Sequence, residues 1–173
     1  MTLKPTHPHP GSAFETTGDP MKEGVGAAAW AKNRADRCDM TVDGRPRIVP
    51  MSTVEGWHVD HRDPDPMGRT VVAGDGVEVG RVVDLWVDQA EPCLRYLTVE
   101  LDSGGRVLLP VGYARISRFR NDVVVKSIFA SQFPDVPKPK ANDRITLLEE
   151  DMIVAYYAGG YRYAEPSRNE PFL

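Results

Sequence analysis

Short runs of β-branched and aliphatic residues, each bounded by turn-forming residues, fill the middle of the chain and restrict its fold more than any other feature. The runs span residues 69–73, 77–87, 94–101, 106–109 and 122–128. Between them lie glycine-rich turns that supply the backbone conformations needed by hairpins, among them Asp102-Ser103-Gly104-Gly105. Apolar residues alternate along the third run and place Leu97, Val99 and Leu101 on one face. The pattern predicts a mainly β domain, built as a small antiparallel barrel.

The hydrophobic period changes from two residues to that of a helix near residue 146. Thr146 is followed three residues later by Glu149, which matches a capping box, and the acidic run that follows suits the positive end of a helix. Gly159-Gly160 is typical of a helix end. We therefore predict one helix over residues 146–160, and a shorter helical turn is an open alternative around 127–133.

Four segments follow from these patterns. Prolines and glycines punctuate residues 1–22, which indicates a flexible or extended tail. Residues 23–66 keep no regular period, so we expect an irregular segment that packs on the barrel or on partner subunits. Residues 67–130 form the predicted barrel core. Residues 131–173 read as a proline-rich connection, the C-terminal helix and a tail.

Composition excludes several functional classes. The formal net charge of -4 over 173 residues argues against a nucleic-acid partner. Cys38 and Cys93 are too few for a disulfide framework and lack the spacing of a zinc site. The longest small and apolar stretch, residues 24–31, falls far short of the roughly 20 residues that span a membrane. No nucleotide-binding, hydrolase or metalloprotease motif occurs, so no catalytic residue and no metal ligand is predicted.

Four separated blocks carry a resemblance to a known family. They are GDPMKEGVGAAAW (18–30), GRVVDLWVD (80–88), RYLTVEL (95–101) and TLLEEDMIVAYYAGGYRYAEP (146–166). In this order they resemble the cytoplasmic part of the H subunit of the purple-bacterial-type photosynthetic reaction centre, whose core is a PRC-barrel. The family's H subunit usually begins with one transmembrane helix, and this sequence contains none. Either the anchor is a separate polypeptide, or it was lost and surface contacts alone hold the domain; of the two we expect a separate transmembrane anchor polypeptide.

The resemblance implies an accessory, non-catalytic subunit of a type II (quinone) reaction centre. Such a subunit caps the cytoplasmic face, stabilises the quinone-binding L and M subunits and assists proton transfer to the secondary quinone. It binds no cofactor itself, and the partner subunits hold the bacteriochlorophyll, bacteriopheophytin, quinone and non-haem iron. The chain would be peripheral at the photosynthetic membrane, with light-harvesting subunits and lipid as further partners and no nucleic acid.

Three residues match family positions beside the quinone-side proton path, namely Asp88, Glu91 and Arg95. The resemblance implies that Arg95 holds or orients Glu91, while Asp88 and Glu91 exchange protons with buried water. Clustered carboxylates suit this task because mutual repulsion and burial raise the pKa of one of them. From spacing alone, a surface hairpin with an ordinary salt bridge explains the same residues.

The family's histidine-rich entry loop is replaced here by residues 39–47, in which arginines stand instead of histidines. Arginine does not titrate near neutral pH, so a histidine-gated entry is not expected. Asp39 and Asp43 are the remaining candidates for accepting protons at the surface.

Other groups have two open interpretations. His58 and His61, beside Asp60, Asp63 and Asp65, suit a solvated loop or a second proton antenna or cation site. Trp86 suits barrel packing or a subunit interface. One of the three acids at 149–151 is either a helix-terminal charge or a member of the proton path. For the whole chain, the alternative function is a PRC-barrel adaptor of the ribosome-maturation type, which binds protein or RNA.

Overall fold

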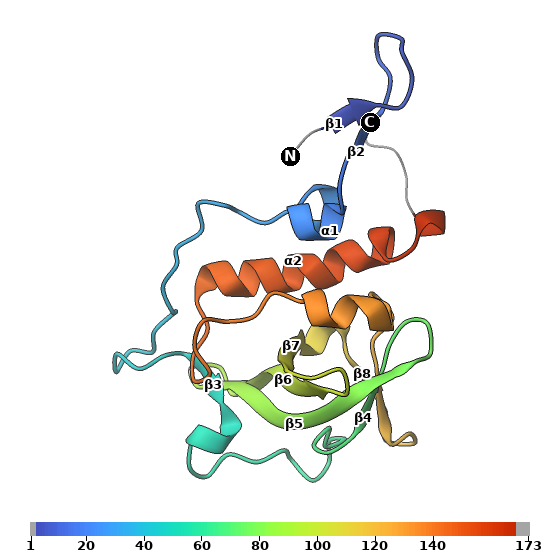
Figure 1. The fold of residues 1–173 in the computed structure, drawn as a ribbon. Coiled ribbons are helices and arrows are strands. Elements are labelled where there is room, and N and C mark those ends of the chain that lie inside the picture. Colours follow the sequence, from blue (N-terminus) through green and yellow to red (C-terminus); the bar gives the residue numbers. More distant parts are fainter. Residues whose placement is uncertain (1–2, 169–173) are drawn as a thin grey trace.

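One curled sheet of seven strands forms the centre of residues 3–168, the part of the chain that this computed structural model describes (Figure 1). Its strands are β3 (Ile48–Pro50), β4 (Thr70–Val72), β5 (Glu78–Asp88), β6 (Cys93–Leu101), β7 (Arg106–Pro110), β8 (Arg115–Ile116) and β9 (Asp122–Val124). The order is β7-β6-β5-β4-β9-β8, and β3 pairs with the end of β5. The predicted mainly β fold is confirmed. One pair departs from the antiparallel arrangement, because β4 and β9 run parallel.

Turn chemistry and alternation account for the central hairpins. Gly104 and Gly105 adopt φ angles of 97° and 84° between β6 and β7, a region open to glycine at little steric cost. Leu97 and Val99 have no exposed surface, as their alternation predicts. β3 and β8 are absent from the predicted set because, unlike the equally short β4 and β9, they do not lie within longer β-branched runs.

The C-terminal helix α2 (Leu147–Tyr163) lies across the sheet (Figure 1). Its capping box is confirmed: Thr146 Oγ1 accepts from the backbone N–H of Glu149, and the Glu149 carboxylate accepts from the backbone N–H of Thr146. The predicted stop at Gly159-Gly160 is wrong, since the helix continues to Tyr163. A Cβ on Gly159 would lie 2.5 Å from the Ala28 Cβ, so these glycines serve close packing rather than termination.

The first 22 residues, predicted as tail, contain a hairpin of β1 (Leu3–Pro5) and β2 (Phe14–Thr16) that projects from the body (Figure 1). A short helix, α1 (Pro20–Glu23), follows it. Asp19 caps this helix by accepting from the N–H of Met21, Pro20 occupies the first position, and Gly24 ends it at φ 64°. The first family-like block therefore encodes a capped helical turn.

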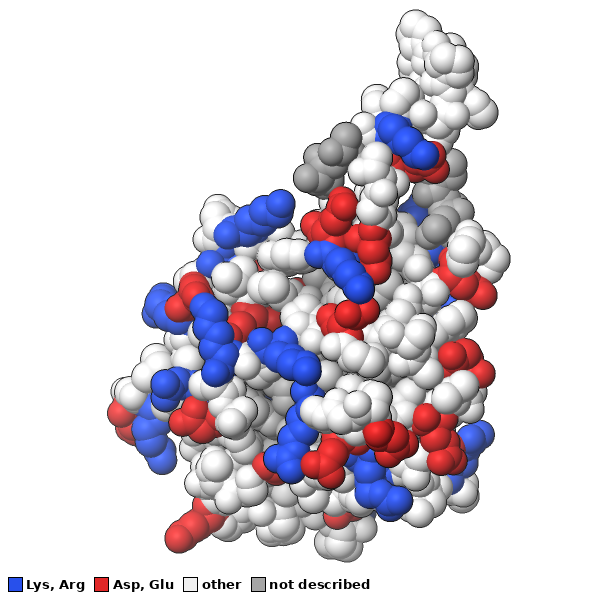
Figure 2. Space-filling view, viewed as in Figure 1, with Lys and Arg blue, Asp and Glu red and all other residues white. Residues whose placement is uncertain are grey.

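Short 3₁₀ turns connect the remaining elements: η1 (Gly26–Ala28), η2 (Met51–Thr53), η3 (Val111–Tyr113), η4 (Ala130–Asp135) and η5 (Pro166–Arg168). η4 corresponds to the helical turn expected around 127–133. The core lies between the sheet and α2, where Phe133, Ile153 and Tyr157 are almost fully buried. No helix within residues 3–168 combines the length and hydropathy needed to cross a membrane. Acidic and basic side chains are interspersed over the body on the face shown in Figure 2.

Candidate functional site

A pocket of about 330 Å³ lies where the sheet, α2 and the segment of residues 29–47 meet. The segment is fastened to the helix start, because the backbone N–H groups of Leu147 and Leu148 donate to the carbonyls of Arg37 and Ala35. These two N–H groups lie in the first turn of the helix, where backbone N–H groups have no hydrogen-bond partners within the helix itself. The charged lining of the pocket consists of Arg34, Asp39, Arg47, Asp88, Arg95, Glu150 and Asp151.

Asp88 is the most tightly held of the predicted residues. Its carboxylate is buried, and Arg47 Nε lies 2.8 Å from both of its oxygens. The backbone N–H groups of Ala90 and Glu91 also donate to Oδ1. Burial raises the pKa of Asp88, but the bonds from Arg47 and from these N–H groups outweigh it, and the net pKa is lowered. The fold therefore favours the ionised form of Asp88.

Glu91 is exposed and pairs with Arg47, whose Nη2 lies 3.1 Å from its carboxylate. The predicted pairing of Arg95 with Glu91 is wrong, since Arg95 Nη2 lies 4.0 Å from Glu150 instead. A register shift explains the difference. Trp86 pairs with Tyr96 and the next residue of β5 pairs with Leu94, so Arg95 is an extra residue in β6. Such a bulge redirects side chains, and it brings Arg95 to the helix.

Glu150 is the residue that the predicted set leaves out. Its side chain is 14% exposed, and its Oε2 accepts a 3.0 Å hydrogen bond from the Tyr96 hydroxyl. Burial raises the pKa of Glu150, the Tyr96 bond and Arg95 partly oppose this, and the negative charges of Asp39 and Asp151 add to it. The only signal in the sequence was its place in the acidic run 149–151, where capping is an equally good explanation.

The three acids of that run have different partners. Glu149 is a capping group that also accepts from the N–H of Lys140. Asp151 pairs with Arg34 at 3.7 Å. Glu149 is buried as well, so what distinguishes Glu150 is that its carboxylate accepts from the buried Tyr96 hydroxyl and that its pKa is raised. The hydrogen bond from Tyr96 of the sheet therefore distinguishes Glu150 from the other two acids.

The two surface candidates are separated by the fold. Asp39 lines the pocket, and its carboxylate lies 3.4 Å from Arg47 Nη1. Asp43 is 75% exposed at the side chain and pairs with Arg45 at 3.4 Å, outside the pocket. The structure thus brings Asp39, Asp88 and Arg95 to one cavity and leaves Asp43 apart.

Two further sequence features have structural explanations. Trp86 is 3% exposed and donates through Nε1 to Thr98 Oγ1, so the predicted packing role is confirmed. His58 lies beside a second, largely apolar pocket, and His61 is 3.5 Å from Asp60. Among residues 3–168, no group of three or more histidine, cysteine or acidic side chains is arranged to hold a metal ion.

The contrast between Asp88 and Glu150 indicates what chemistry the pocket can perform. Arg47 keeps Asp88 charged, while Glu150 gives up its proton less readily than an exposed glutamate does. Asp39 and Asp151 add negative potential near Glu150, which strengthens the hold of its carboxylate on a proton. A carboxyl group with raised proton affinity beside fixed charges can bind and release protons closer to neutral pH.

Two family models match the chain. The first, described as the H-chain N-terminal region of the photosynthetic reaction centre, matches residues 1–53. The second, the PRC-barrel domain, matches residues 58–132 and contains the strands β4 to β9. The first match includes α1 and most of the segment that borders the pocket. Together with the fold, these matches identify the chain as an H-type, PRC-barrel subunit of a photosynthetic reaction centre.

Proposed function

We propose that this subunit caps the cytoplasmic face of a type II reaction centre, stabilises its quinone-binding L and M subunits and conducts protons toward the secondary quinone. The observation that carries the proposal is the pocket with one carboxylate held ionised, Asp88, and another of raised pKa, Glu150. A reduced quinone needs protons from water, and a path of titratable groups with suitable proton affinities supplies them. The role is accessory and not catalytic.

In this proposal the acids have separate tasks. Glu150 binds and releases the transferred proton, because burial raises its pKa toward neutrality. Asp88, paired with Arg47, is a fixed charge of the pocket and holds the turn after β5 through the N–H groups of Ala90 and Glu91. Glu91 and Asp39, which contact the same arginine from the surface, deliver protons to the pocket.

The partners follow from the same proposal. The L and M subunits hold the bacteriochlorophyll, bacteriopheophytin, quinones and non-haem iron. Light-harvesting subunits and lipid are further partners around the complex. The match of residues 1–53 to an H-chain region outside the barrel favours this assembly over a ribosome-maturation adaptor. In membrane fractionation the chain should co-purify with pigmented complexes, and recovery with ribosomes would contradict the proposal.

Flash-induced proton uptake in the assembled complex tests the mechanism. Replacing Glu150→Gln removes the titratable group and retains its size, so we expect slower uptake on the second quinone reduction. Asp43→Asn is the matched control, since this exposed acid lies outside the pocket and should leave the rate unchanged. Equal uptake rates in the two variants would remove Glu150 from the path.

The double variant Asp88→Asn with Glu91→Gln tests the fixed charges. Both side chains contact Arg47, and their replacement removes negative potential from the pocket. We expect slowed uptake at unchanged complex yield, measured with the same flash assay. Unaltered kinetics in a fully assembled complex would exclude these two residues from proton delivery.

A further inference from the structure

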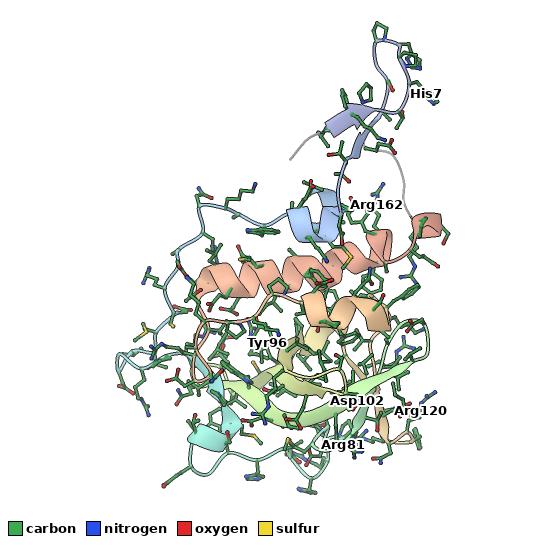
Figure 3. All side chains as sticks on the ribbon, in the orientation of Figure 1. His7, Arg81, Tyr96, Asp102, Arg120 and Arg162 are labelled. Atoms are coloured by element: carbon green, nitrogen blue, oxygen red, sulfur yellow. The ribbon has the colours of Figure 1, made fainter. Side chains whose placement is uncertain are left out.

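Tyr96 occupies the boundary between the sheet and α2, and its hydroxyl has a specific partner there. It lies in β6 between the neighbouring strands, paired in register with Trp86 of β5 and Pro110 of β7. The residue is 3% exposed, and Figure 3 shows it between the sheet and the helix. A phenylalanine would fill the same apolar volume, so packing alone does not require the oxygen.

The hydroxyl donates to Glu150 Oε2 at 3.0 Å. A phenol that donates to a carboxylate stabilises the charged form of that carboxylate, because the bond is stronger to an anion than to a neutral acid. Burial makes water a poor substitute for this donor, and Tyr96 itself lines the pocket. The orientation of the Glu150 side chain is thereby set from the sheet.

The charged groups around Glu150 come from every element that borders it. Arg95 of β6 approaches at 4.0 Å, and Asp151, held by Arg34, is its neighbour on α2. The segment 29–47 contributes Asp39, while Arg47 and Asp88 form a mutual ion pair in the same pocket. Tyr96 is the one uncharged hydrogen-bond donor to the carboxylate among the described residues. Its contribution can therefore be removed without changing the net charge of the site.

We propose that Tyr96 is a positioning residue, whose hydroxyl orients the Glu150 carboxylate and favours its ionised form, so that the acid releases its proton onward. The part of this inference that concerns proton delivery rests on the proposed function. The hydrogen-bond part concerns only this chain. The two parts can fail separately.

The test is a titration of the full chain by carbon NMR with isotope-labelled glutamate, the Glu150 signal being assigned from Glu150→Gln. Tyr96→Phe should shift the Glu150 midpoint to higher pH, since the donor to the charged form is lost. Tyr156→Phe is the matched control, because its hydroxyl donates to the Gln132 carbonyl and it should leave the midpoint in place. Asp39→Asn should shift the midpoint to lower pH, because a repelling charge is removed.

Difluorotyrosine at position 96 provides a second variant of nearly the same shape if Tyr96→Phe does not fold. Its phenol is a stronger hydrogen-bond donor, so the Glu150 midpoint should move to lower pH. A midpoint that is unchanged in Tyr96→Phe, or unchanged with the fluorinated residue, overturns the inference. A shifted midpoint with normal proton uptake in Glu150→Gln would instead retain the positioning role and refute the proposed function.

Discussion

The glycine pair of α2 provides a sharp test of how the N-terminal segment is held against the PRC-barrel. Gly159 and Gly160 lie on a helix face that approaches two other parts of the chain. A Cβ on Gly160 would overlap the carbonyl oxygen of Ser127 and lie 2.9 Å from its carbonyl carbon. A Cβ on Gly159 would meet the Ala28 Cβ at 2.5 Å. Normal contacts between such atoms are well beyond these distances.

The expected change in the free energy of unfolding follows from two opposing effects. Replacing a helical glycine by alanine gains about 1 kcal/mol of helix propensity. Overpacking costs about 1–3 kcal/mol, and we expect the upper value at Gly160 because the obstructing atoms belong to backbone. Gly160→Ala should therefore lower the free energy of unfolding by about 2 kcal/mol, or the Tm by about 4–8 °C in a chain of this size. Gly159→Ala should cost about 1 kcal/mol, since its contacts with Ala28, 2.5 Å to Cβ and 3.0 Å to the backbone Cα, are less severe than those at Gly160.

Double-mutant cycles separate steric contact from a general loss of helix stability. Ala28→Gly removes the methyl opposite Gly159, so its combination with Gly159→Ala should recover about 1 kcal/mol relative to additivity. Its combination with Gly160→Ala should be additive, because that clash involves Ser127. Urea unfolding followed by circular dichroism measures the parent and all five variants. A Gly160→Ala variant as stable as the parent would refute the packing argument.

Two further perturbations test the start of α2 and the buried ion pair. Thr146→Ala removes one side of the capping box and should lower the free energy of unfolding by about 1 kcal/mol in the same urea assay. Asp88 has a folded-state pKa below its ordinary value of 3.8, so it stabilises the fold above that value and loses this contribution as pH falls through the lower one. Arg47→Met removes the bond that lowers this pKa, and acid unfolding followed by tryptophan fluorescence should begin at higher pH. Arg45→Met, whose partner Asp43 is exposed, should not move it.

Much of the fold is predictable because its signals are local. Runs of β-branched residues, glycine turns and a capping box depend on neighbours a few positions away, and they identify β4 to β7, β9 and the start of α2. The end of α2 is not predictable in this way. Gly159-Gly160 has the composition of a helix stop, and only the approach of Ala28 and Ser127 explains why glycine is needed inside the helix.

The candidate site, too, is predictable from the sequence only in part. Resemblance to the H-chain family selects Asp88, Glu91 and Arg95, and two of these line the pocket. The arginine that neutralises Asp88 lies 41 residues away in sequence, and Glu150 lies 54 residues from the Tyr96 that binds it. No spacing rule relates such positions, because β3, β5, β6 and α2 bring them together.

By itself, the sequence determined the fold class, the family and the start of the C-terminal helix. Each of these depends on local periodicity, turn chemistry or sequence blocks that occur in the order of the family. The tertiary structure alone decided which charges meet. A one-residue bulge in β6 directs Arg95 to α2 rather than to Glu91. The packing of α2 on the sheet leaves the Glu150 side chain only 14% exposed, whereas Asp43, in the loop of residues 39–47, is 75% exposed. Electrostatics depends on distance and burial in space, and both are set only when the long-range contacts of the chain are made.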